Sequence, residues 1–254
     1  MDLNLARAHI LITGATRGIG RAIAVAAAEE GANISFCARD AKAVEAMQAE
    51  LKAKGVMAFG RALDVADDTA LGTFISDAAQ HFGQLDGVVA NASALVSGAS
   101  RQAFEAAFNT DLMHTRCAAE AARPYLEKSM RAAFVAISSI SGSEAYGYDS
   151  VAYGTMKAAL FFYVKTLARE VAPQGIRANL VSPGTTLFDG GYWDKVRQEN
   201  PARFADNIAF NPMGRMATVE EIANVVVFLL SPRASFVSGE NITVDGTATQ
   251  RIPG

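Results

Sequence analysis

Short apolar segments alternate with longer amphipathic segments along the chain. The apolar segments are rich in Val, Ile, Ala and Phe, as buried strands are, and they span residues 9–13, 33–38, 57–63, 87–90, 133–137, 177–181 and 241–244. Helical patterns span residues 19–30, 41–54, 67–82, 101–128, 151–171 and 218–230, and Gly31, Gly83 and Pro232 stand where three of them end. The pattern predicts seven strands that alternate with helices for most of the chain.

Strand–helix alternation with short turns produces right-handed crossover units and a parallel sheet that helices cover on both faces. No repeat of fixed period and no low-complexity linker divides the chain, so we expect one doubly wound α/β domain over residues 1–254. Residues 185–216 interrupt the alternation, because they carry no strand pattern and are rich in Phe, Trp and Asn. A connection of this length is usually functional, and we expect it to form a lid over a substrate site.

Composition narrows the class of protein. Of the 254 residues, 50% are hydrophobic and 19% are charged, which provides a sizeable core and excludes extensive disorder. The formal net charge is −3 without a basic patch or tail, so we expect no nucleic-acid partner.

The two cysteines, Cys37 and Cys117, are too few for a disulfide framework and indicate buried thiols in a reducing cytoplasm. No signal peptide and no apolar run of ~20 residues is visible, so we expect no membrane partner. His9, His81 and His114 lie too far apart for a metal-binding motif, and we expect no metal.

Residues 13–20 read TGATRGIG and directly follow the first predicted strand. Gly14 permits a sharp turn, Gly18 permits the backbone to approach a pyrophosphate, and Gly20 permits close packing of helix against strand. The same residues also form plain tight turns, so the glycines alone are weak support. Their position between a strand and a helix favours nucleotide binding.

This turn has the TGxxxGxG spacing of the short-chain dehydrogenase/reductase family, and the chain resembles the classical subgroup of that family over nearly its whole length. Further family motifs follow in the expected order, namely Asp64-Val65, Asn91-Ala92, Ser139, Tyr153-Gly154-Thr155-Met156-Lys157 and Pro183-Gly184. The resemblance implies a Rossmann-like fold with a seven-stranded parallel sheet, a nicotinamide cofactor and a homotetramer or homodimer. The residues that it assigns to cofactor binding are Gly14, Thr16, Arg17, Gly18, Ile19, Gly20, Arg39, Asp64, Val65, Asn91, Ala92, Tyr153, Lys157, Pro183, Gly184 and Thr186.

The end of the second predicted strand bears on which nicotinamide cofactor is used. An acidic residue there hydrogen-bonds the ribose 2′-hydroxyl of NAD, whereas a basic residue accommodates the 2′-phosphate of NADP. Ala38 stands at the expected acidic position, Arg39 follows it, and Arg17 lies in the glycine-rich turn. Two guanidinium groups that converge on one phosphate bind it strongly, so we expect NADP(H) rather than NAD(H). The alternative is two solvated arginines with Asp40 as a helix cap.

Tyr153 and Lys157 are four residues apart and share one face of a predicted helix. A free tyrosine, with a pKa of about 10, is a poor proton acceptor at neutral pH, but an ammonium group nearby favours its phenolate form. Tyr153 would then exchange a proton with a carbonyl or alcohol oxygen, and the resemblance also has Lys157 hold the ribose hydroxyls. A tyrosine and a lysine at this spacing often occur by chance, with the tyrosine in the core and the lysine on the surface. A catalytic role is favoured here because the pair follows the glycine-rich turn and the serine motif in the order found in the family.

The family pattern at residues 137–142, which read ISSISG, identifies Ser139 as the catalytic serine. Its hydroxyl would hydrogen-bond the substrate oxygen as charge develops there. Ser141 is the alternative, and Ser138 is expected to point away. Ser139 precedes Tyr153 by fourteen residues, one more than the usual family spacing, and we place the extra residue in the loop 143–150.

Two positions depart from the family pattern. Ser93 stands where the family usually has glycine, and Asp111 stands where many members have an asparagine whose backbone carbonyl holds a water molecule for proton relay. An aspartate keeps that carbonyl, and its carboxylate is expected to raise the pKa of Lys157 or to shift the pH optimum. In the alternative register Asp111 is a solvated helix residue. Asn109, two residues earlier, points to another face.

The predicted lid is rich in aromatic residues, namely Phe188, Tyr192, Trp193, Phe204 and Phe210, and Phe188 takes the place of a threonine that is usual in the family. Apolar aromatic residues around a cleft suit a medium-sized, partly apolar substrate. The same residues are equally suited to packing within the lid or to contact with another subunit.

These observations predict an NADP(H)-dependent oxidoreductase that transfers hydride between the nicotinamide and a carbonyl or secondary alcohol, with Ser139, Tyr153, Lys157 and Asp111 as its catalytic residues. A 3-oxoacyl thioester reductase is a specific version, in which basic residues of the lid, Arg197 and Arg203, would contact an acidic carrier protein. The alternative is a non-catalytic NADP(H)-binding regulator or sensor. Such proteins usually lack the tyrosine or the lysine, and this chain has both.

Overall fold

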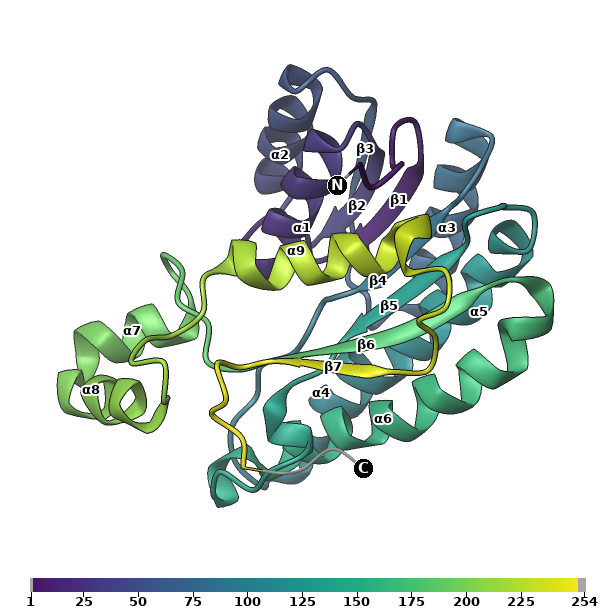
Figure 1. Ribbon diagram of the computed structural model, residues 1–254. Helices are drawn as coiled ribbons and strands as arrows, with labels where there is room; N and C mark the ends of the chain where they lie inside the picture. Colours follow the sequence, from purple (N-terminus) through teal and green to yellow (C-terminus); the bar gives the residue numbers. More distant parts are fainter. Residues whose placement is uncertain (1, 251–254) are drawn as a thin grey trace.

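All seven predicted strands are present in the computed structural model, which describes residues 2–250, and they form one parallel sheet (Figure 1). The strands are β1 (His9–Thr13), β2 (Asn33–Ala38), β3 (Ala58–Ala62), β4 (Gly87–Ala90), β5 (Ala133–Ile137), β6 (Arg177–Pro183) and β7 (Asn241–Val244). They pair in the order β3-β2-β1-β4-β5-β6-β7. The Rossmann-like fold class expected from the sequence is confirmed.

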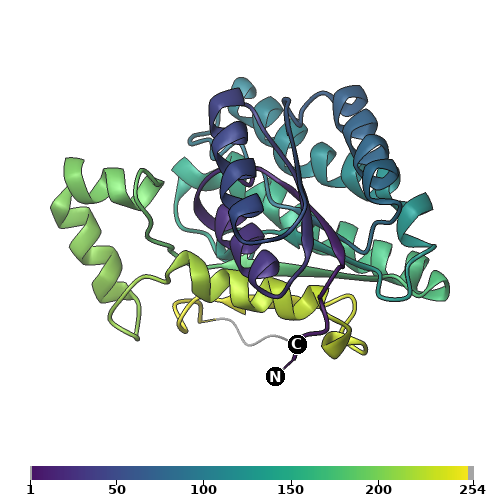
Figure 2. The ribbon, with the colours of Figure 1, turned by 90° about the horizontal axis from the view of Figure 1, so that it is seen from above.

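Helices cover both faces of this sheet (Figures 1 and 2). They are α1 (Gly18–Glu29), α2 (Ala41–Ala53), α3 (Asp68–Phe82), α4 (Arg101–Ala107), α5 (His114–Leu126), α6 (Val151–Val171), α7 (Tyr192–Glu199), α8 (Pro201–Phe210) and α9 (Val219–Leu230). Helices α1, α2 and α9 share one half of the core, and α3, α5 and α6 share the other. No helix within residues 2–250 is long and apolar enough to cross a membrane.

Each central strand contributes side chains to both halves of the core. In β1, Ile10 and Ile12 pack with α1 and α9, whereas Leu11 packs with α3 and α5. Successive side chains of a strand point to opposite faces, so a strand that is covered on both sides must be apolar at most positions. All five residues of β1 are buried, which explains why the strands read as short apolar runs.

The sheet order places the candidate motifs at one edge of the molecule. β2 and β3 are added on one side of β1, and β4 to β7 are added on the other. In such sheets ligands bind outside the carboxyl ends of the strands at this switch point. The glycine-rich turn follows β1, Asp64 follows β3, Asn91 follows β4, Ser139 follows β5, and Pro183 ends β6. The motifs therefore meet along this edge.

The stretch expected as one helical zone, residues 101–128, is interrupted. Between α4 and α5 lies a π-helical segment, Phe108–Met113, and α5 ends at Leu126. A π-helical turn is often found at functional sites. It separates the two α-helices at the position of Asp111.

The segment expected as a lid contains two helices, α7 and α8, which the sequence pattern did not identify. They pack against each other and stand away from the sheet, beyond the end of β6 (Figures 1 and 2). We call α7 and α8, residues 192–210, the arm. The arm follows the carboxyl end of β6, and its role as a lid stays a prediction.

Two buried histidines hold β1 to its surroundings in their neutral form. The Nδ1 atom of His9 lies 2.5 Å from the carbonyl oxygen of Gln84, and Nε2 lies 2.7 Å from the Ser35 hydroxyl. His114 likewise has Nδ1 2.9 Å from a backbone carbonyl in the preceding helical turn and Nε2 2.9 Å from the Thr13 hydroxyl. Only an N–H group can face a carbonyl, so Nε2 is the acceptor in both rings. Burial lowers the pKa of each histidine to about 4.

We predict that acid destabilises this fold through His9 and His114. Between pH 6.5 and about 4 the unfolded chain binds protons on both residues and the folded chain does not. The free energy of unfolding therefore falls as the pH is lowered through this window, and these residues leave it unchanged above pH 6.5. Each residue accounts for about 3 kcal/mol. Urea titrations at a series of pH values measure this, and His9→Asn and His114→Asn should each reduce the slope. An unchanged slope in both variants would contradict the assignment.

Candidate active site

The glycine-rich turn after β1 is shaped to receive a negatively charged group. Gly14 and Gly18 adopt φ angles of 69° and 55°, in the left-handed region that favours glycine. A Cβ atom at Gly20 would overlap the carbonyl oxygen of Gly14 and the side-chain nitrogen of Asn91, so the expected close approach of helix and turn is observed. Arg17 precedes α1 without capping it by its side chain. The N–H groups at this helix start suit a phosphate, and the turn therefore fits a dinucleotide cofactor.

Asn91 and Thr13 fasten this turn to β4. Asn91 donates from Nδ2 to the carbonyl oxygens of Thr13, at 2.9 Å, and Gly14, at 3.1 Å. The Thr13 hydroxyl oxygen accepts from the backbone N–H groups of Asn91, at 3.0 Å, and Ala92, at 3.2 Å. The sequence assigned Asn91 and Ala92 to the cofactor, and the structure adds a supporting role in holding the turn. Thr13 was missed, although a polar residue at the end of a buried strand is the signal that marks it.

The two arginines expected near a 2′-phosphate are exposed. The side chains of Arg17 and Arg39 make no hydrogen bond or ion pair with the residues that the structure describes. Asp40 caps α2 by accepting from the backbone N–H groups of Lys42, at 2.9 Å, and Ala43, at 3.2 Å. This cap was expected in the alternative interpretation, in which the two arginines are solvated. Because Asp40 binds the start of α2 and not an arginine, both guanidinium groups are available to a ligand.

Asp64 and Val65 follow β3 at the same edge of the sheet. The Asp64 Oδ1 atom accepts from the backbone N–H of Ala66 at 3.0 Å, which fixes the turn that leads toward α3. Val65 is 6% exposed and belongs to the core beneath this turn. Both residues are therefore held in fixed positions on the side of the sheet where the resemblance places an adenine.

Lys157 lies at the centre of the predicted catalytic group. Its side chain is 2% exposed, and Nζ donates to the carbonyl oxygen of Ile137 at 2.8 Å. The same nitrogen lies 3.0 Å from Asp111 Oδ1 and 5.5 Å from the centre of the Tyr153 ring. Burial acts to lower the pKa of Lys157, but attraction by Asp111, with a contribution from Tyr153, raises it above its ordinary value. Lys157 is therefore held as an ammonium ion beside the tyrosine.

The structure distinguishes the three serines after β5. Ser138 donates from Oγ to the backbone carbonyl of Lys157 at 3.0 Å and is buried, so it ties β5 to α6. Ser139 is 8% exposed, and its Oγ accepts from the backbone N–H of Ser141 at 3.1 Å. Its O–H proton remains available to an acceptor. Ser138 directly follows Ile137, the residue that binds Lys157, and Ser139 comes next, at the start of the short helical turn Ile140–Gly142.

Two glycines within the quoted motifs, Gly142 and Gly154, bring this serine segment against α6. A Cβ atom at Gly142 would lie 2.8 Å from the backbone of Lys157, and one at Gly154 would lie 2.5 Å from the carbonyl oxygen of Ser141. Only glycine permits so close a contact between the two backbones. The serine segment and the tyrosine–lysine helix are therefore fixed relative to each other.

Asp111 is buried rather than solvated. Its side chain is 0% exposed, and Oδ2 accepts from the backbone N–H of Ala94 at 3.3 Å. Lys157 is the charged neighbour of Oδ1, which accepts no hydrogen bond of good geometry from the residues described. The backbone carbonyl of Asp111 accepts from the Thr115 hydroxyl at 2.8 Å. The carboxylate thus contacts the lysine directly.

Phe188 lies over the glycine-rich turn. A Cβ atom at Gly18 would lie 2.7 Å from Phe188 Cζ, and one at Gly191 would lie 2.8 Å from the same atom. The ring fills the open side of Gly18, where the sequence predicts a pyrophosphate.

The end of β6 packs against the residue that follows β7. A Cβ atom at Gly184, the residue after Pro183, would lie 2.8 Å from Asp245 Cα. Thr186 is 8% exposed and donates from its hydroxyl to the carbonyl oxygen of Gly184 at 3.1 Å. The Thr186 hydroxyl is therefore engaged within this turn.

The loop 143–150 joins the arm and the C-terminal segment. The ring of Tyr146 meets that of Phe210 edge-on, with centroids 6.3 Å apart. Glu144 Oε1 accepts from the backbone N–H of Gln250 at 2.6 Å. Since this loop connects the candidate serine to the candidate tyrosine, these contacts border the space in front of both.

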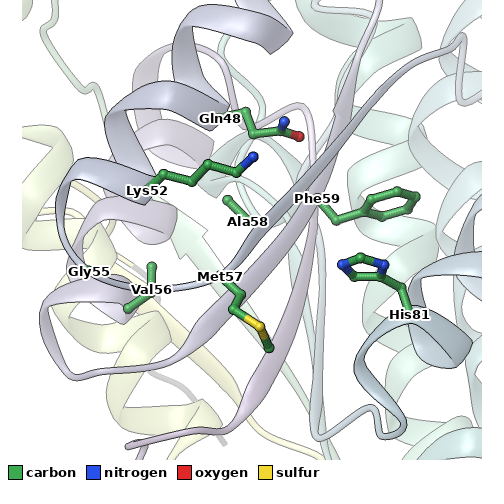
Figure 3. Close-up of a pocket in the computed structure, with 8 residues that line it drawn as sticks. All are labelled: Gln48, Lys52, Gly55, Val56, Met57, Ala58, Phe59 and His81. Atoms are coloured by element: carbon green, nitrogen blue, oxygen red, sulfur yellow. The ribbon is translucent and has the colours of Figure 1, made fainter.

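A hollow of about 510 Å³ lies elsewhere, at the amino end of β3 (Figure 3). Its lining consists of Gln48, Lys52, Gly55, Val56, Met57, Ala58, Phe59 and His81. None of the predicted site residues is among them. The parallel sheet separates this hollow from the carboxyl ends of the strands, and it carries no part of the candidate site.

Known proteins resemble this chain over almost its full length. The sequence pattern of a family described as Enoyl-(Acyl carrier protein) reductase matches residues 14–249. Isoepoxydon dehydrogenase from Penicillium expansum is 39% identical over 249 residues, which are 97% of this chain and 96% of that protein. A 3-oxoacyl-acyl-carrier-protein reductase from Staphylococcus aureus is 34% identical over 242 residues, 93% of this chain and 96% of that protein. The crystal structure of L-sorbose reductase from Gluconobacter frateurii, complexed with NADPH and L-sorbose, has a TM-score of 0.91 at 29% identity and covers 99% of this chain and 100% of its own.

We predict that Gly20→Ala destabilises the protein by roughly 1–3 kcal/mol, because the added methyl group overlaps Gly14 and Asn91. Gly72, inside α3, is the matched control, since a Cβ atom there meets nothing within 4 Å. Gly72→Ala should stabilise by about 0.5–1 kcal/mol through helix propensity alone. Urea denaturation of both variants measures the difference, and equal effects would show that the turn has room.

Proposed function

Since this chain belongs to the short-chain dehydrogenase/reductase family and is therefore an oxidoreductase that uses a nicotinamide cofactor, we propose that it is an NADP(H)-dependent carbonyl reductase, or alcohol dehydrogenase in the reverse direction. The observation that carries the proposal is the buried ammonium of Lys157 beside the ring of Tyr153, at the carboxyl edge of the sheet. The nicotinamide, when bound, donates or accepts the hydride.

The residues of the site have separate roles in this proposal. Tyr153 gives a proton to the carbonyl oxygen during reduction and takes it back during oxidation. Lys157, fixed by Ile137 and Asp111, favours the phenolate through its charge and holds the ribose of the cofactor. Ser139 donates its free O–H proton to the substrate oxygen. Asp111 supports the proton relay through its contact with Lys157.

The choice of NADP(H) is supported by the charges around the second strand. Ala38 removes the carboxylate that would repel a 2′-phosphate, and Arg17 and Arg39 are exposed without a protein partner among the described residues. The similar L-sorbose reductase was crystallised with NADPH. We assign the remaining cofactor contacts to the glycine-rich turn and to the motifs after β3, β4 and β6.

The substrate in this proposal is a medium-sized, partly apolar carbonyl or alcohol compound. It enters beneath a lid of residues 185–216, which contains the arm. The similar proteins are named for isoepoxydon, L-sorbose and 3-oxoacyl groups, so family likeness alone leaves the class wide. Arg197 pairs with Asp194 at 2.5 Å, and Arg203 lies over the rings of Tyr192 and Trp193. Both arginines are engaged within the arm, which favours a free small molecule over an acyl group on an acidic carrier protein.

We also propose a homotetramer or homodimer in the cytoplasm. Phe162 on α6 and Phe236 before β7 are 80% and 104% exposed, and large exposed apolar side chains support contact with another subunit. Cys37 and Cys117 are free and buried, in agreement with a reducing compartment.

A panel of ketones and alcohols, assayed with both nicotinamide cofactors, tests the proposed function. We expect NADPH consumption with at least one ketone or NADP⁺ reduction with the matching alcohol. Tight NADPH binding without turnover on any compound would contradict the proposed enzyme activity and favour a cofactor sensor.

We predict that Tyr153→Phe removes at least ~99% of turnover and leaves the dissociation constant for NADPH within about twofold, because only the proton donor is lost. Steady-state rates and fluorescence titration measure the two quantities. The control is Tyr163→Phe in the same helix, which removes a hydroxyl that has no hydrogen-bond partner among the described residues and should retain full activity. Wild-type turnover in Tyr153→Phe would remove this residue from the mechanism.

We predict that Arg39→Asp shifts preference from NADP⁺ toward NAD⁺ by a factor of about 100, since a carboxylate repels the 2′-phosphate and accepts from the 2′-hydroxyl. The ratio of kcat/KM values for the two cofactors measures this. Arg101→Asp makes the same charge change at an exposed position in α4 and should leave the ratio unchanged. Undiminished NADP⁺ preference in Arg39→Asp would place the phosphate elsewhere.

A further inference from the structure

The side chains of Asp111 and Lys157 form an ion pair that is excluded from solvent. Their exposed fractions are 0% and 2%, and 3.0 Å separate Oδ1 from Nζ. Little water is available to screen charge there, so the pair acts on its surroundings nearly as a unit. A bare lysine would present one positive charge to the ribose end of a cofactor, whereas this pair presents a dipole of zero net charge.

The carboxylate is held in place independently of the lysine. The π-helical segment sets the position of Asp111, and the backbone N–H of Ala94 donates to its Oδ2 at 3.3 Å. Its backbone carbonyl, the group that the family resemblance assigns to a water molecule, already accepts from Thr115 at 2.8 Å. The side chain acts on Lys157 directly, because Oδ1 lies 3.0 Å from Nζ.

The other titratable groups around the lysine do not replace this charge. Tyr153 faces it from α6, with its ring centre 5.5 Å from Nζ. His114 faces the pair from α5 and is neutral at neutral pH, because burial lowers its pKa to about 4. Of the three groups, Asp111 is the one that places a carboxylate oxygen 3.0 Å from Nζ.

We propose that Asp111 is a positioning residue whose carboxylate neutralises Lys157, so that the site binds the oxidised, positively charged nicotinamide better, relative to the reduced, neutral one, than a site with an unbalanced lysine would. The inference rests on the proposed function for the placement of the cofactor, and it concerns a charge balance that the family's asparagine does not provide. A neutral pair does not repel a cationic ring, whereas an unbalanced ammonium does. The same balance weakens the pull of Lys157 on the phenolate of Tyr153 and moves the activity of the enzyme toward alkaline pH.

The direct test is the ratio of dissociation constants for NADP⁺ and NADPH in Asp111→Asn, which keeps the shape and the acceptor for Ala94. We expect NADP⁺ to weaken relative to NADPH on the order of tenfold, the effect of one unit charge across about 10 Å at an effective dielectric constant of 20. Fluorescence titration with each nucleotide measures this without turnover. An unchanged ratio in folded Asp111→Asn would overturn the proposal.

Asp86→Asn is the matched control. Asp86 is also a buried carboxylate, 6% exposed, but it precedes β4 at the opposite end of the sheet, where it accepts from the backbone N–H of His9. Its loss should lower stability and leave the nucleotide ratio at the wild-type value. A shift of the same size in both variants would assign the effect to stability and overturn the proposal.

A double variant covers the case in which Asp111→Asn does not fold. Asp111→Asn combined with Lys157→Met removes both charges and leaves no unpaired buried ion. Lys157→Met alone should bind NADP⁺ more tightly relative to NADPH than the double variant does, because its carboxylate is unopposed. Equal ratios in these two variants would overturn the proposal.

The rate profile provides the second measurement. In Asp111→Asn the midpoint of the rise of kcat/KM with pH in alcohol oxidation should move to lower pH by about one unit, because the ammonium then favours the phenolate without opposition. A profile that stays in place while turnover persists contradicts the inference but leaves the proposed function intact. A shifted ratio of the NADP⁺ and NADPH dissociation constants, without any turnover, supports the charge balance and contradicts the proposed function.

Discussion

The buried ammonium group of Lys157 determines the arrangement of the candidate site. Nζ binds the carbonyl oxygen of Ile137 at the end of β5 and pairs with Asp111 from the π-helical segment, while Ser138 holds the backbone carbonyl of the same lysine. Removal of one partner from a buried ion pair typically costs about 3–5 kcal/mol. Departures from this geometry are therefore strongly disfavoured, and Tyr153, one turn earlier on α6, is fixed along with the lysine.

A second buried network holds the glycine-rich turn, and it meets the first at α5. Thr13 accepts from the backbone N–H groups of Asn91 and Ala92, and its hydroxyl reaches Nε2 of His114 at 2.9 Å. His114 is three residues from Asp111 in the chain, at the junction of the π-helical segment and α5. The turn that suits a cofactor and the group that suits proton transfer are therefore positioned by adjoining polar contacts.

Much of the fold and the membership of the site were predictable from local patterns. Apolar runs such as residues 9–13 and 133–137 became strands because each is buried on both faces, and TGATRGIG became the turn that its glycines permit. The interruption of the helical zone at 108–113 was not predictable, since a π-helical turn leaves no break in the hydrophobic pattern. Nor was the contact of Phe188 with Gly18, because it joins a residue that follows β6 to the turn that follows β1.

The sequence by itself determined the fold class, the family and the residue types of the site, because side-chain periodicity and motif order are properties of neighbouring residues. Only the tertiary structure decided which atoms meet. Asp111 and Lys157 come from different helical elements, and Thr13 and His114 are 101 positions apart in the chain. No local pattern specifies such pairs, because they arise from the packing of α5 and α6 against the ends of the strands. That packing turned an aspartate, which the sequence left open between a relay residue and a solvated one, into the buried counter-ion of the lysine.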